Sequence, residues 1–105
     1  MAKGITDAER KSIYLNVKID AFRKTFMESE FEDVNIVDGK LIKCELISAR
    51  LKSVKFFNCD LSDTSFRKAK IEDVIFENCI FSNTKFAKVL FDKNIIFKST
   101  TIIQG

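Results

Sequence analysis

The chain has 105 residues, of which 46% are hydrophobic and 31% charged, and its formal net charge is +3. This length and composition fit one domain with a packed core and exclude a disordered chain. Basic and acidic residues nearly balance (18 against 15) and form no basic run of five, which indicates a solubilising surface and not a nucleic-acid footprint. No apolar stretch approaches the roughly 20 residues of a transmembrane helix.

The N-terminal sequence MAKGITDAERKS lacks the apolar core of a signal peptide, and the three cysteines are an odd number. These features predict free thiols in a reducing compartment, and therefore a cytoplasmic location. Pro is absent and only 3 Gly occur, so many tight hairpin turns are not expected. The aromatic residues are 11 Phe and one Tyr, a set that suits burial more than ligand recognition.

Residues 1–28 are predicted to form an N-terminal cap on a five-residue repeat that occupies residues 29–98. Thr6 or Asp7 would be the N-cap of a short helical turn. From Ile13 to Ala21 apolar and polar residues alternate, which is the period of a strand. We therefore favour a strand with a helical lead-in; the alternative, a single helix over 7–22, would scatter the apolar residues around its circumference. A second possible role is an arm exchanged with, or added to, a partner.

Residues 29–98 carry a large apolar residue at every fifth position, a period that fits neither a helix nor an isolated strand. The fourteen positions of this large series are Phe31, Ile36, Leu41, Leu46, Leu51, Phe56, Leu61, Phe66, Ile71, Phe76, Phe81, Phe86, Phe91 and Ile96. The residue two before each is small or β-branched, except Asn94. Most residues between the two series are polar, so each quintet offers two inward and three outward side chains.

A second period of 20 residues lies on the first. Val34, Val54 and Val74 are 20 residues apart, and so are Cys59 and Cys79. A chain that turns a corner every five residues returns to the same side after four quintets. Like residues would then stack on one another at the strand spacing of about 4.8 Å, so the pattern predicts a square coil.

These quintets resemble the pentapeptide-repeat family, whose motif A(D/N)LXX has Leu or Phe at its centre. The closest quintets are CDLSD at 59–63, ARLKS at 49–53, AKIED at 69–73 and TKFAK at 84–88. The resemblance covers residues 29 to about 98 and implies an all-β fold, a right-handed quadrilateral parallel β-helix of about three and a half coils. Asn58, Asn78 and Asn83 end their quintets, where Asn suits a corner because it tolerates left-handed backbone.

Residues 99–105 are predicted to form a C-terminal cap or tail. An inserted residue near Asn94 would place Ile95 and Phe97 in the small and large inward positions, and Thr100 and Ile102 would then follow in phase. With or without this inserted residue, the last coil carries apolar side chains at its end. Members of the family often dimerise through this coil, so we expect a homodimer, against the alternative of capping by the tail. The candidate dimer end is Ile96, Phe97, Ile102 and Ile103.

No catalytic, cofactor or metal site is recognised in the sequence. His is absent, which removes the usual general base and the commonest zinc ligand. Cys44, Cys59 and Cys79 all occupy the small inward position and are interpreted as reduced, buried hydrophobic residues. No phosphate-binding loop, HExxH or CxxC motif occurs. We therefore expect neither an enzyme nor a cofactor.

Two outward surfaces are candidate contact sites. One side of the coil is predicted to expose an apolar column, unless the N-terminal segment covers it. Its residues are Val37, Phe57 and Ile75, with Ile95 and Phe97 near the top. Another side carries a weak basic patch, Arg67, Lys68, Lys85 and Lys88. It lacks aromatic residues for stacking bases, so direct nucleic-acid binding is not expected and a solvated face is the favoured interpretation.

The sequence thus predicts a non-catalytic protein-binding module, a rigid prism that docks on a macromolecular partner and inhibits or scaffolds it. The alternative comes from the best-known family relatives, which protect DNA gyrase from quinolones by mimicking DNA. That mimicry requires a strongly acidic surface, and a net charge of +3 disfavours it. Small cytosolic repeat proteins of this kind are expected among bacterial or phage products, including inhibitors of host machinery.

Overall fold

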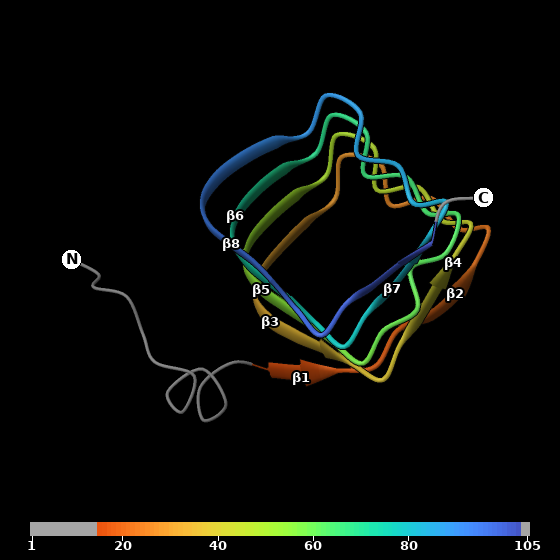
Figure 1. Cartoon of the computed structure of the whole chain (residues 1–105). Coiled ribbons are helices and arrows are strands. Elements are labelled where there is room, and N and C mark those ends of the chain that lie inside the picture. Colours follow the sequence, from red (N-terminus) through yellow and green to blue (C-terminus); the bar gives the residue numbers. More distant parts are fainter. Residues whose placement is uncertain (1–14, 104–105) are drawn as a thin grey trace.

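The computed structural model describes residues 15–103, which wind into stacked four-sided coils of parallel strands (Figure 1). Within this range there are nine strands and no helix. The strands are β1 (Leu15–Val17), β2 (Asp20–Phe22), β3 (Glu30–Val37), β4 (Lys40–Ile42), β5 (Arg50–Phe57), β6 (Lys70–Glu77), β7 (Ile80–Ser82), β8 (Leu90–Lys98) and β9 (Thr101–Ile103). The predicted helical turn near Thr6 and Asp7 lies outside the described residues.

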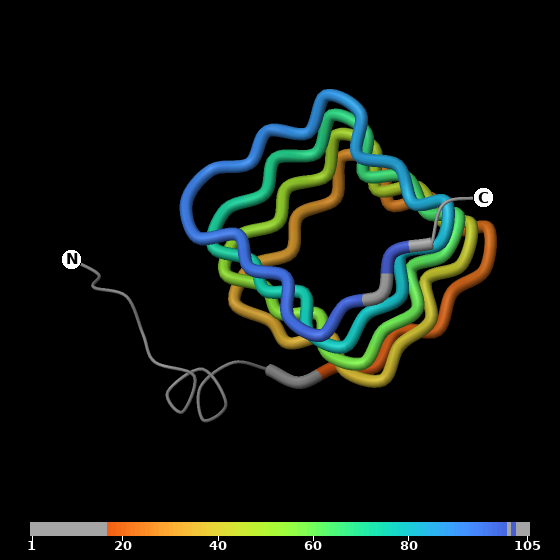
Figure 2. Tube along the Cα trace, in the orientation of Figure 1, coloured from red at the N-terminus to blue at the C-terminus, as the bar shows by residue number. Residues whose placement is uncertain are grey.

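The sides of the coil are parallel ladders in which each strand pairs with the one below and above it. The largest sheet has the order β1-β3-β5-β6-β8, and β2-β4 and β7-β9 form two smaller sheets. Single bridges such as Glu45↔Ser65 and Ser65↔Lys85 continue the ladder on a further side. Figure 2 shows the resulting quadrilateral trace. The predicted quadrilateral parallel β-helix is therefore confirmed.

The core is built from the two inward series. Between Ile36 and Phe81, every buried apolar residue except Ile75 belongs to one of them. Phe rings stack in register along the axis: the centroids of Phe56 and Phe76 are 5.0 Å apart, and those of Phe66 and Phe86 are 5.2 Å apart. Burying each such side chain contributes about 1.5–3 kcal/mol, so the stacked series supply most of the driving force for folding.

The corners of the coil are made by left-handed residues, none of which is Gly. Every fifth residue from Arg23 to Lys93 has a positive φ, between 54° and 61°. The prediction that Asn58, Asn78 and Asn83 serve as corners is confirmed. Asn side chains also link successive coils, since Asn78 Nδ2 donates to Asn58 Oδ1 at 2.9 Å.

The first coil is formed by the segment that alternates apolar and polar residues. Val17, Ile19 and Ala21 all pack against the core, as the alternation predicted. Leu15 aligns with Val34 but Asp20 aligns with Lys40, so this coil is one residue shorter than the 20-residue period. The paired strands run from Leu15 to Ile103 and thus extend beyond 29–98 on both sides.

The last coil contains one extra residue at Asn94. Register shifts between Glu72 and Val74, so that Val74 aligns with Ile95 and Phe76 with Phe97. Both Lys93 and Asn94 have positive φ. The prediction of an inserted residue is therefore confirmed. Ile95 and Phe97 consequently take inward positions, and their assignment to the outward apolar column was wrong.

Candidate interaction surfaces

The predicted apolar column divides into two columns in the structure. Val37 aligns with Phe57, and Phe57 aligns with Glu77 in the next coil. This column therefore changes from apolar to charged side chains along the axis. Ile75 lies in the neighbouring column, between Lys55 and Ile96. Phe57 is 36% exposed, whereas Ile75 is only 6% exposed. The prediction that Ile75 is an exposed contact residue was therefore wrong.

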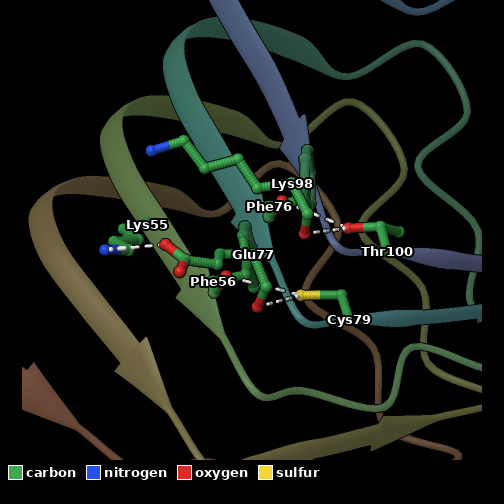
Figure 3. A network of polar contacts seen from close by, with 7 residues as sticks. All are labelled: Lys55, Phe56, Phe76, Glu77, Cys79, Lys98 and Thr100. Carbon is green, nitrogen blue, oxygen red and sulfur yellow. Dashed lines mark hydrogen bonds and ion pairs between the residues drawn. The ribbon is translucent and has the colours of Figure 1, made fainter.

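An ion pair lies beside Ile75. Lys55 Nζ is 3.2 Å from Glu77 Oε1 (Figure 3). The ammonium also lies 5.6 Å from the centre of the Phe57 ring. Lys55 neighbours Ile75 in the ladder and Glu77 follows it on the same strand, so both side chains flank it. This side of the prism consequently offers Phe57 and Val37 but no continuous apolar stripe.

Polar groups inside the prism are satisfied between coils. Cys79 Sγ donates to the carbonyl oxygens of Phe56 at 3.4 Å and Glu77 at 3.5 Å, and Thr100 Oγ1 donates to those of Phe76 and Lys98 at 3.2 and 3.0 Å (Figure 3). The hydrogen bond with Cys59 and burial raise the pKa of the Cys79 thiol far above its usual range. Both thiols are free and buried, which is the arrangement of structural cysteines.

Five of the nine exposed large apolar residues found in the described part of the chain lie in the last coil, on β8 and β9. We call these five residues the C-terminal apolar surface; they are Leu90, Phe91, Ile96, Phe97 and Ile102, all exposed. The Phe97 ring stacks on Phe76 with centroids 5.1 Å apart, yet 46% of the residue is exposed. Three of the four predicted dimer-end residues belong to this surface, and the fourth, Ile103, lies in β9.

The four predicted basic-patch residues are all exposed, and the structure adds two more cations to them. Arg50 and Lys70 are register partners on the side that follows the same corner. We call the six residues the basic corner: Arg50, Arg67, Lys68, Lys70, Lys85 and Lys88. Sequence reasoning missed Arg50 and Lys70 because it considered each side of the coil separately, although adjacent sides meet at a corner.

No metal-ligating group of three or more Cys, Asp, Glu or His side chains occurs within residues 15–103. The same part of the chain contains no helix long and apolar enough to cross a membrane. The three inward thiols and the surface carboxylates therefore form no metal-binding cluster in the described residues.

The family model of pentapeptide repeats matches residues 44–83 as eight copies. This part of the chain consists of pentapeptide repeats. Among solved structures the chain is similar to the pentapeptide repeat protein Rfr23 from the cyanobacterium Cyanothece 51142, with 13% sequence identity and a TM-score of 0.53. The match covers 83% of this chain and 87% of Rfr23. At that identity the likeness shows a shared fold and nothing more.

A second solved structure is QnrB1, a plasmid-mediated fluoroquinolone resistance protein, with 17% identity and a TM-score of 0.40. The match covers 76% of this chain but 41% of QnrB1. No curated protein matches the sequence significantly. Any inference about its function is therefore based on the surfaces of the molecule.

Proposed function

We propose that this protein is a non-catalytic protein-binding module that docks through its C-terminal apolar surface. The exposure of five large apolar side chains in one coil carries the proposal. Contiguous apolar surfaces of this kind on small proteins are contact sites. Strand β8 also lies at the edge of the main sheet, where its outer backbone groups have no neighbouring strand among the described residues.

The partner we propose is a second copy of the chain, joined end to end. Within the prism, Phe rings of successive coils stack at about 5 Å, and Phe97 presents its outer face at the end of such a stack. A two-fold axis through this end would bring the same apolar surface of each copy together, which makes the interface self-complementary. Water would then be excluded from Phe91, Phe97 and Ile102.

The remaining features support a binding role over a catalytic one. The sequence contains no His, and the Cys59 and Cys79 thiols are engaged inside the prism. The net charge of +3 does not supply the acidic surface that DNA mimicry requires. Three buried free thiols support a cytoplasmic location, where thiols are kept reduced.

The test is the mass of the protein in solution, measured by size-exclusion chromatography with light scattering. We expect wild type to have twice the 12.1 kDa mass of one chain, and the double variant Phe91→Glu/Ile102→Glu to be a monomer. The matched control is Phe57→Glu/Met27→Glu, which places the same charges on exposed apolar residues away from the last coil and should leave the dimer intact. Circular dichroism checks that each variant folds. A monomeric wild type at high concentration, or a dimeric end variant, would contradict the proposal.

A further inference from the structure

The basic corner gathers six exposed cations on the two sides of one edge of the prism. Lys68 and Lys88 form the edge itself and have φ values of 61° and 59°. Arg67 and Lys85 lie on the side before the edge, and the Arg50–Lys70 pair lies on the side after it. The cations therefore project from a convex ridge and in more than one direction.

Like charges are stacked directly above one another along this ridge. Arg50 and Lys70 are register partners in adjacent strands. In the described part of the chain, Glu30 aligns with Arg50 on its other side but forms no ion pair with it. Lys68 and Lys88 occupy the same corner position in successive coils, one strand spacing of about 4.8 Å apart. Directly opposed like charges in a ladder are destabilising, so this arrangement has a cost in the isolated chain.

Elsewhere the chain relieves charges between coils. Lys93 Nζ is 3.9 Å from Glu72 Oε2, and Asn58 Nδ2 donates to Asp38 Oδ1 at 2.6 Å. Another stacked pair, Arg23 and Lys43, lies over the ring of Phe22 at 5.2 and 6.0 Å. By contrast, none of the six cations of the basic corner has an ion-pair partner within residues 15–103. An anion from outside the chain would relieve their repulsion.

Direct nucleic-acid binding was not expected from the sequence, but that prediction did not include Arg50 and Lys70 in the basic patch. With these residues added, we propose that the basic corner binds the phosphate backbone of double-stranded DNA. Phosphates are bound by Lys and Arg without an apolar centre. The outward residues between these cations include Ser48, Ser65 and Ala87, and the exposed Leu90 aligns with Lys70 at the end of the prism. A protein partner would need an apolar core in the interface, and protein interfaces are depleted in Lys. Single strands are bound through aromatic side chains that stack on bases, and the ridge has none.

The shape of the ridge favours a duplex. B-DNA has phosphates along both edges of a major groove about 12 Å wide. A convex edge with cations on both flanks can approach such a groove and contact both strands. These contacts carry no base-specific hydrogen bonding, so the binding is expected to be independent of sequence and strongly dependent on salt.

The test is fluorescence polarisation of a labelled duplex, titrated with protein over a series of salt concentrations. If all six cations contact phosphate, log K against log salt has a slope of about −5. The variant Lys68→Gln/Lys88→Gln should bring the slope about 1.8 closer to zero and weaken binding. The control Lys40→Gln/Lys43→Gln removes the same charge, one corner residue included, from another edge and should leave the slope unchanged.

Three outcomes would overturn the proposal. Absence of binding to the duplex at low salt excludes it directly. An equal loss of duplex binding in the control variant shows that net charge, and not the basic corner, is responsible for the binding. Tighter binding of polyglutamate or of a single strand than of the duplex assigns the surface to a different partner. Circular dichroism and melting temperature establish that both variants fold, and the dimer mass is measured separately, so failure here does not bear on the C-terminal apolar surface.

Discussion

The rings of Phe76 and Phe97 are stacked with 10° between their planes and 5.1 Å between their centroids, although the two residues are one position further apart than the 20-residue period. The backbone accommodates the difference at Lys93 and Asn94, which are consecutive left-handed residues with φ of 55° and 29°. Packing of large side chains therefore sets the register of the last coil, and the corner adjusts to it.

Deleting Asn94 should be tolerated. The deletion restores a 20-residue coil and leaves Lys93 as the single corner residue, so Ile95 and Phe97 keep their inward positions. We expect a melting temperature equal to or above that of wild type, measured by circular dichroism. Deleting Asp73, the corner one coil below, is the matched control. This deletion shifts every later residue by one position and turns core side chains outward. It should therefore abolish the cooperative unfolding transition.

The fold and the corners could be predicted because they depend on spacing within each quintet. Asn58 and Asn78 follow from their place in the quintet, whatever lies on the next coil. The burial of Ile75 could not be predicted in this way, since it depends on neighbours such as Lys55 and Glu77 from other positions of the ladder. The basic corner likewise depends on how two sides meet, a relation that the five-residue period does not contain.

Gly39 lies in the small inward series at a place with no room for a methyl group. A Cβ there would be 2.6 Å from the backbone oxygen of Ile19, which accepts a hydrogen bond from Lys40 N at 3.0 Å. We expect Gly39→Ala to lower the free energy of unfolding by about 1–3 kcal/mol in urea denaturation. Adding Ile19→Ala should not restore stability, because the clashing atom belongs to the main chain. Recovery in the double variant would show that side-chain crowding was responsible.

The left-handed corners differ in how much strain they carry. Glu28 has φ of 60° and is exposed, and a residue with a Cβ pays for this conformation where Gly does not. Glu28→Gly is expected to stabilise the protein by about 0.5–1 kcal/mol in chemical denaturation. Asn78→Gly is the comparison: Asn tolerates the conformation and its side chain bonds Asn58, so no gain is expected there. Equal gains at both positions would argue against a role for the Asn ladder.

The thiols of Cys59 and Cys79 should be unreactive in the folded protein. Both residues are buried. The hydrogen bond with Cys59 and burial raise the pKa of Cys79, whose Sγ donates to the Phe56 carbonyl oxygen. The same hydrogen bond lowers the pKa of Cys59, so the protection of that thiol depends on its burial. Iodoacetamide at neutral pH should therefore modify them only after denaturation, as followed by mass spectrometry with and without urea. Rapid modification of the folded chain would show that the coils open locally, which the dense core of stacked rings argues against.

Thr64 is the most deeply buried hydroxyl among the described residues, with 0% of the residue exposed. Its Oγ1 donates to the carbonyl oxygen of Leu41 and accepts from Cys44 N at 3.2 Å, so one side chain joins two coils. Thr64→Val keeps the shape but leaves both main-chain groups without this partner, and should cost about 1–3 kcal/mol of unfolding free energy. Thr84→Val is the matched control, because Thr84 makes the same bond to Leu61 O at 2.7 Å in a partly exposed position where water can replace it. A cost at Thr84 as large as that at Thr64 would show that the bond itself, and not its burial, determines the loss.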